Sequence, residues 1–242
     1  MPPALPLALR LLGYGLLLFV ISGPLHRFGG FHYRLAMLVL VVGVGLLAAG
    51  LVTGGVAVAA SLRAGTGVPW AAALLGLAAL VPLGMVASMI VTGFRVPVIH
   101  DITTDTDDPP AFVALLPLRE GAESPAEYDG PEAARLQLEG YPALAPLRTA
   151  QPPAEVLPAA AEVADELGWT VQVVAPAEGR LEALATTKWF GFTDDVVVRV
   201  RPDGSGSVVD IRSKSRVGRS DLGANAARIR KFLAALAARL ER

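Results

Sequence analysis

The sequence predicts an α+β protein in which a transmembrane bundle of about three helices precedes a soluble domain ordered helix, four-stranded antiparallel sheet, helix. The chain has 242 residues, and residues 1–99 contain no Asp or Glu, so all 22 acidic residues lie in residues 100–242. Residues 1–99 also contain long uncharged apolar segments, as membrane helices do. Regular helical and strand periodicity begins only near residue 154.

Composition excludes several classes of protein. Hydrophobic residues make up 53% of the chain and charged residues 18%, against about 45–50% and about 25% in soluble domains. The absence of Cys excludes a disulfide scaffold, a thiolate metal site and a Cys nucleophile. A pI near 6.3 argues against general nucleic-acid binding, so no nucleic-acid partner is expected.

The membrane region is predicted to cover residues 1–96, with three spans at about 5–21, 35–60 and 69–94. A span needs about 20 apolar residues, which the second and third segments exceed without a charge. The first segment is shorter and contains Arg10, whose long side chain can reach the headgroups. A cleaved signal peptide is the other interpretation of this first segment.

The two long spans contain no Asp, Glu, Lys or His, which argues against a proton-coupled transporter and favours an anchor. Gly50 and Gly54 form a pair of small residues on one face of the second span. We expect this face to pack within the chain. The alternative is a face for a second chain, which would make the protein a structural subunit of a membrane complex.

The predicted location is the cell (inner) membrane, crossed several times. The three arginines on the side of the soluble domain exceed the two on the other side, which leans slightly toward a cytoplasmic domain. The side of the soluble domain stays unresolved at this level.

Residues 97–153 are predicted to form an acidic, Pro-rich arm that wraps the folded domain, with one short helix near residues 131–139. Four acids gather at its start: Asp101, Asp105, Asp107 and Asp108. Oxygen ligands suit calcium, but the spacing is not that of an EF-hand, and an Asx-turn connector is favoured. No metal and no cofactor are therefore expected.

Residues 154–242 are predicted to fold as the α+β domain. Helices are expected at 155–167 and 221–239, and strands at 169–174, 180–190, 196–201 and 207–214. Short turns between the strands, above all Asp203-Gly204-Ser205-Gly206, predict an antiparallel meander with helices on one face. Alternation places apolar residues toward the helices and charged residues on the opposite face, namely Arg199, Arg201, Asp210, Arg212 and Lys214, which makes that face predominantly basic.

Two stretches carry a resemblance, Thr186–Asp195 and Val209–Asn225, together with Ile99–Pro110. They closely resemble the bacterial and plastid family called domain of unknown function 1499, over about residues 97–240. The resemblance implies no established activity, so no catalytic residue is carried over. Some members look like lipoproteins or carry targeting peptides, which implies an extracytoplasmic domain in them. The arginine count of this chain instead slightly favours a cytoplasmic domain.

The candidates for binding an anion or a partner come from the basic end of the domain: Arg212, Lys214, Arg216, Arg219 and Ser220. Arg216, Arg219 and Ser220 lie just before a predicted helix, whose free N–H groups and dipole could bind an anionic headgroup or phosphate. Two other interpretations stay open, a solvated surface and an internal clasp with the acids Asp101–Asp108. The clasp is favoured and predicts that Arg216→Ala and Arg219→Ala lower stability.

Aromatic residues flank the turn after the second predicted strand. Trp189, Phe190 and Phe192 are candidates for the membrane interface, where aromatic side chains are favoured. For Trp189 a position in the domain core is favoured, because it shares a strand face with Leu181 and Ala183.

The preferred function is a non-catalytic module near the membrane surface that binds an anionic lipid, a small ligand or a membrane-protein partner. All three His precede residue 101, so we expect no His-based triad or zinc site in the folded domain. The alternative is a hydrolase-like enzyme using Asp101 and Asp105 with Arg216 and Arg219. A cleft lined by these residues would favour the enzyme, and an open basic sheet face would favour the module.

Overall fold

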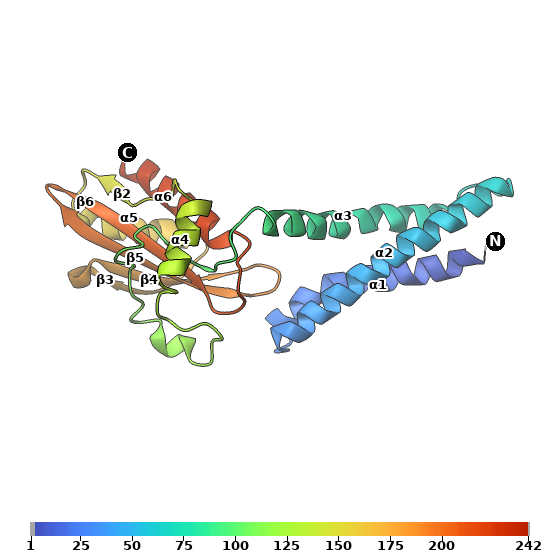
Figure 1. The fold of residues 1–242 in the computed structure, drawn as a ribbon, viewed down its shortest axis with the longest axis horizontal. Helices are drawn as coiled ribbons and strands as arrows, with labels where there is room; N and C mark the ends of the chain where they lie inside the picture. The colour runs from blue at the N-terminus through green and yellow to red at the C-terminus, as the bar shows by residue number, and fades with distance from the viewer. Residues whose placement is uncertain (1–2, 242) are drawn as a thin grey trace. The chain divides into compact units, whose positions relative to one another are not determined.

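A computed structural model describes residues 3–241 and divides the chain into two compact units (Figure 1). One unit comprises residues 1–91 together with 188–191. The other comprises residues 92–187 together with 192–242.

The first unit is built from three long apolar helices, α1 (Ala4–Arg27), α2 (Tyr33–Arg63) and α3 (Trp70–Gly93). Their mean hydropathies are 2.1, 2.8 and 2.3, and all three are long and apolar enough to cross a membrane. This confirms three candidate spans. The first helix is longer than the predicted 17 residues, because it continues through Pro24 to Arg27.

The glycines of α2 pack against α1 of the same chain. A Cβ added to Gly50 would lie 2.8 Å from the side chain of Leu12, and Gly54 is buried beside Ala8. Small residues let two helix backbones approach closely. The expected packing within the chain is therefore confirmed, and this face is not open to a second chain.

The first unit also includes the tip of a hairpin, residues 188–191. Trp189 is half-buried, with its ring centroid 4.8 Å from that of Phe19 on α1. Its indole Nε1 donates a hydrogen bond to the carbonyl of Val20. The expectation that Trp189 belongs to the core of the sheet domain is therefore wrong. Phe190 is buried, and Phe192, just outside the tip, is half-buried.

The second unit has the predicted order of helix, four strands and helix. Its elements are α5 (Pro153–Glu166), β3 (Thr170–Ala175), β4 (Arg180–Thr186), β5 (Thr193–Asp203), β6 (Gly206–Ser215) and α6 (Ala224–Leu240). The β5–β6 hairpin closes through a two-residue loop in which Gly204 has φ 60°, a conformation that favours glycine.

The sheet has six strands, so the predicted number of four is wrong (Figure 1). The added strands are β1 (Asp101–Thr103) and β2 (Leu147–Thr149), and both pair antiparallel with β6. The order is β1-β6-β5-β4-β3, with β2 on the same edge of β6 as its further partner. Strands of three residues are too short for alternation to reveal them in a sequence.

The remaining short elements connect these strands. They are the 3-10 helices η1 (Leu116–Arg119) and η2 (Pro176–Glu178), and α4 (Pro131–Gly140). The predicted helix near residues 131–139 is thus confirmed, with Pro131 at its first position, where a missing N–H has no cost.

The core lies between the sheet and the helices α5 and α6. The predicted inward valines and isoleucine of β5 and β6 all belong to it: Val196, Val198, Val200, Val209 and Ile211. They pack with Ile229 and Phe232 of α6 and Val163 of α5. The opposite face carries the charged residues that build the candidate site.

Helix α6 begins three residues later than predicted. Leu222 and Gly223 both have positive φ values, 52° and 81°, which no helix contains. The Asp221 carboxylate accepts hydrogen bonds from the backbone N–H groups of Gly223 and Asn225. Burial raises the pKa of Asp221, although these two hydrogen bonds act in the opposite direction.

Candidate functional site

The sheet face opposite the helices is covered by the arm and is not an open basic surface. Phe112 and Leu115 of the arm pack on Val197, and all three are buried. Arg212 and Lys214 lie under the same arm, at 2% and 0% exposure. The open basic face that would favour a binding module is therefore not found here, because the arm covers the face and supplies carboxylates that neutralise its cations.

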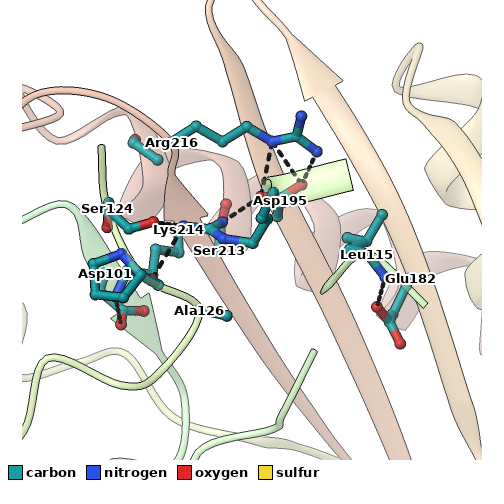
Figure 2. A network of polar contacts seen from close by, with 12 residues as sticks. Asp101, Leu115, Ser124, Ala126, Glu182, Asp195, Ser213, Lys214 and Arg216 are labelled. Atoms are coloured by element: carbon teal, nitrogen blue, oxygen red, sulfur yellow. Dashed lines mark hydrogen bonds and ion pairs between the residues drawn. The ribbon is translucent and has the colours of Figure 1, made fainter. Parts of the chain in front are cut away.

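Asp101 of β1 is the centre of one buried charge cluster (Figure 2). Its two oxygens accept from Arg212 at 2.8 Å each, in the bidentate geometry that arginine favours. Lys214 Nζ lies 3.2 Å from Asp101 and 2.6 Å from Asp129. The Arg212 guanidinium also stacks on Phe112, 4.8 Å from the ring centroid. Every charge in the cluster has an opposite partner.

His100 lies at the edge of this cluster and belongs to the folded unit. Its Nε2 is 3.0 Å from Ser124 Oγ and 3.6 Å from Asp129. A His thus lies beside a Ser and an Asp in the folded unit, although all three residues precede residue 154. In a Ser-His-Asp relay the acid binds the other ring nitrogen, but here Nδ1 is buried without a hydrogen-bond partner. The geometry does not match that relay.

Tyr128 closes the cluster on the arm side. Its ring lies 5.5 Å from the Arg212 guanidinium carbon. Burial, with the nearby charges of Asp101 and Asp129, raises the pKa of Tyr128 to about 12. The phenol is therefore protonated at neutral pH and does not act as a base.

A second cluster binds the acidic segment to strands β5 and β6. Arg199 donates to Asp108 at 2.8 Å and to Asp105 at 3.1 Å. Arg201 reaches Asp105 and also donates at 2.8 Å to Asp210, which is fully buried. The acidic segment is thus clasped internally. Asp101 is bound by Arg212 and Lys214 of the predicted binding set, whereas Asp105 and Asp108 are bound by Arg199 and Arg201, which lie outside that set.

Glu182 of β4 is held by a turn of the arm (Figure 2). Its carboxylate accepts backbone hydrogen bonds from Val113, Ala114 and Leu115, at 2.9–3.1 Å, and an ion pair from Arg180. Successive backbone N–H groups form such an anion-binding turn. The sequence signal for this site is a single acidic residue, Glu182, between the apolar strand residues Leu181 and Ala183.

Asp195 of β5, also fully buried, binds two arginines. Arg216 donates to it from Nε at 3.0 Å and from Nη2 at 2.7 Å (Figure 2). Arg119 donates to it from the arm. The expected pairing of Arg216 with the acids Asp101–Asp108 is therefore wrong. Arg216 follows β6 directly, and the start of the neighbouring β5 supplies the nearer carboxylate.

We expect Arg216→Ala to lower the free energy of unfolding by about 1.5–3 kcal/mol, because Asp195 loses charge-assisted hydrogen bonds. Arg119 keeps the carboxylate paired, which limits the loss. Thermal unfolding of the full-length protein in detergent measures the effect. Arg219→Ala is the matched control and should leave the melting temperature unchanged; equal losses in both variants would contradict this assignment.

The loop after β6 lies against the segment that follows α3. Asp221 N–H donates to the Ile99 carbonyl, and Ser215 N–H donates to the His100 carbonyl. Two glycines show how closely these segments approach. A Cβ added to Gly93 would lie 3.3 Å from the side chain of Leu222, and one added to Gly223 would lie 3.4 Å from the side chain of Val96. The loop and the end of the third apolar helix therefore meet within the second unit.

Two arginines at this junction are exposed, Arg95 and Arg219. Within residues 3–241, neither side chain makes an ion pair or a hydrogen bond to the protein. Beside them Phe94 is 87% exposed. Ser220 Oγ accepts only from the backbone N–H of Leu222, at 3.3 Å. The junction thus combines uncompensated positive charge with an exposed aromatic ring.

A shallow, open hollow of about 250 Å³ lies at the start of α6. Its lining combines apolar and basic side chains: Leu167, Trp169, Ala224, Ala227, Arg228 and Lys231. None of the residues named for the hydrolase alternative lines it. In the described part of the chain, no three His, Cys, Asp or Glu side chains gather as metal ligands.

The buried carboxylates of this face hold the arm on the sheet and are not exposed to solvent. Asp101, Asp195, Asp210 and Glu182 are each 0% exposed and ion-paired, so a substrate does not reach them. Of the predicted site residues outside the aromatic set, Asp107 and Asp108 stay exposed among the acids and Arg219 among the bases. The exposed arginine junction and the hollow are the surfaces that remain for function.

Comparison with known proteins identifies a family. A family model described as "Protein of unknown function (DUF1499)" matches residues 101–236, which is more than half of the chain. No curated protein matches the chain. The matched range includes the four fully buried carboxylates, Asp101, Glu182, Asp195 and Asp210, and the loop after β6.

Proposed function

The chain belongs to the DUF1499 family, and we propose that it is a multi-pass protein of the cell (inner) membrane whose folded domain is a non-catalytic module that binds anionic lipid headgroups. The observation that carries the proposal is the junction of the basic loop with the end of α3. Residues 94–98 follow a candidate span directly, so covalent connection places them near the membrane surface. The hydrogen bond from Asp221 N–H to the Ile99 carbonyl supports a position of the loop beside this segment.

The charges at this junction favour an anionic partner. Arg95 and Arg219 are exposed, and their side chains are bound to no carboxylate among the described residues. Each Lys or Arg near an anionic bilayer surface contributes about 1 kcal/mol of attraction. The exposed ring of Phe94 favours the interface between headgroups and acyl chains.

The buried clusters support a binding role over a hydrolytic one. A general acid or base must contact its substrate, and Asp101 is fully buried between Arg212 and Lys214. Asp105 is held by Arg199 and Arg201. These carboxylates fix the arm on the sheet and leave the proposed recognition to the exposed arginines.

We expect Arg95→Ala and Arg219→Ala each to weaken binding of phosphatidylglycerol about fivefold, the loss of about 1 kcal/mol per arginine. Native mass spectrometry of the full-length protein in gentle detergent measures it, with phosphatidylcholine as the neutral reference. Arg148→Ala is the matched control. Arg148 is exposed on β2, which pairs with the start of β6, far from the junction at the end of β6, and it forms an ion pair with Asp203 of β5. No preference for the anionic lipid in the wild-type protein would refute the proposal.

A further inference from the structure

The hollow at the start of α6 lies at the end of the sheet where the chain arrives from α3. One row of paired residues crosses the sheet at this end: Thr170 of β3, Leu184 of β4, Asp195 of β5, Lys214 of β6 and Asp101 of β1. Strands β3 and β1 run in the same direction, so the residues before them lie at the same end of the sheet. Trp169, which lines the hollow, and His100, which continues from α3, are those residues.

The other wall of the hollow reaches the same junction. Ala224 follows Gly223, whose added Cβ would lie 3.4 Å from Val96. The hollow therefore opens close to the segment that leaves the third candidate span. This closeness along the chain favours a ligand that is itself held at the membrane surface.

The floor of the hollow is apolar and rigid. Trp169 is 7% exposed and stacks on Phe232, with ring centroids 5.1 Å apart. Leu167 and the small side chains of Ala224 and Ala227 complete this floor. Such a surface suits the carbon skeleton of a glycerol group, which presents C–H groups beside its polar oxygens.

The charge of the hollow is positive and comes from one side chain. Arg228 is neutralised, because it donates at 2.6 Å to Asp194 and at 2.9 Å to Ser213. Lys231 is exposed, and within residues 3–241 its ammonium makes no ion pair. No acidic residue lines the hollow. Lys231 is thus placed to bind an anion.

We propose that this hollow binds the headgroup of one anionic phospholipid, with Lys231 contacting the phosphate and Trp169 packing against the glycerol backbone. The inference rests on the proposed recognition of anionic lipid at the junction and names a discrete site for it. A volume of about 250 Å³ lies below the roughly 300–1,000 Å³ of pockets for drug-sized ligands, so it suits a headgroup and leaves the acyl chains in the bilayer.

The test counts phosphatidylglycerol molecules bound to the full-length protein in gentle detergent by native mass spectrometry. Ala227→Phe fills the hollow without removing a charge, and we expect it to remove one bound phosphatidylglycerol. Ala234→Phe makes the same change at another exposed position of α6, outside the hollow, and should leave the number unchanged. Lys231→Gln should weaken the same binding step about fivefold and leaves the apolar floor intact.

Failure of this inference is distinguishable from failure of the proposed function. If Ala227→Phe and Lys231→Gln both bind as the wild type does while Arg95→Ala and Arg219→Ala bind less, the hollow is overturned and junction recognition stands. If none of the four variants differs from the wild type, both fail. A further measurement adds soluble glycerol 3-phosphate at the same concentration as phosphatidylglycerol. If it displaces the bound lipid, the ligand of the hollow is a free phosphate ester, and the proposal of a membrane lipid is overturned.

Discussion

Asp101→Ala is expected to lower the free energy of unfolding by about 3–5 kcal/mol, because it leaves Arg212 and Lys214 buried without their shared carboxylate. Both cations are almost fully buried, so water does not replace the lost partner. For a unit of this size about 1 kcal/mol shifts the melting temperature by 2–4 °C, so we expect a fall of roughly 6–20 °C. Thermal unfolding of the full-length protein in detergent measures it.

The matched control is Asp107→Ala, six residues along the same acidic segment. Asp107 is exposed, and within the described residues its carboxylate makes no ion pair. Exposed substitutions of this kind change stability by less than about 0.5 kcal/mol. Equal melting temperatures for Asp101→Ala and the wild type would contradict the buried cluster and return Asp101 to the candidates for catalysis.

Glu182→Ala is expected to cost at least about 3 kcal/mol and to release the arm from the sheet. The carboxylate accepts backbone hydrogen bonds from residues 113–115 and an ion pair from Arg180, and hydrogen bonds to a charged group contribute about 1.5–3 kcal/mol each. The released segment carries Arg119, which is 6% exposed in the folded protein. Trypsin should therefore cleave after Arg119 much faster in the variant.

Glu178→Ala is the control for this experiment. Glu178 pairs with the same arginine, Arg180, at 2.8 Å, but its side chain is 60% exposed. We expect no faster cleavage after Arg119 in Glu178→Ala, since an exposed pair contributes little. Similar cleavage rates in the two variants would show that the arm does not depend on Glu182.

The sequence was sufficient for elements with a clear period. The uncharged apolar segments predicted the three membrane-length helices, and alternation in Val196–Val200 and Val209–Ile211 identified the sheet face that packs on α5 and α6. It did not reveal β1 or β2, because each has three residues and pairs through backbone groups of β6. Their position depends on a partner distant in the sequence.

The candidate site shows the same division. The basic character of the outer sheet face was predictable from the alternation of Arg199, Arg201 and Arg212. The neutralisation of that face was not, because a hydrophobic pattern does not say which carboxylate meets which cation. Arg216 was expected to bind the acidic segment and binds Asp195 instead.

Local periodicity and composition were enough to predict the three membrane-length helices, the order of the α+β core and the charge of each segment. The tertiary structure alone decided which charges are buried in pairs and which remain exposed. Ion pairing depends on distances of a few ångströms between residues far apart in the chain, as between Asp101 and Arg212. Among the described residues, Arg95, Arg219 and Lys231 are exposed and make no ion pair, so they are the cations that we propose for binding a ligand.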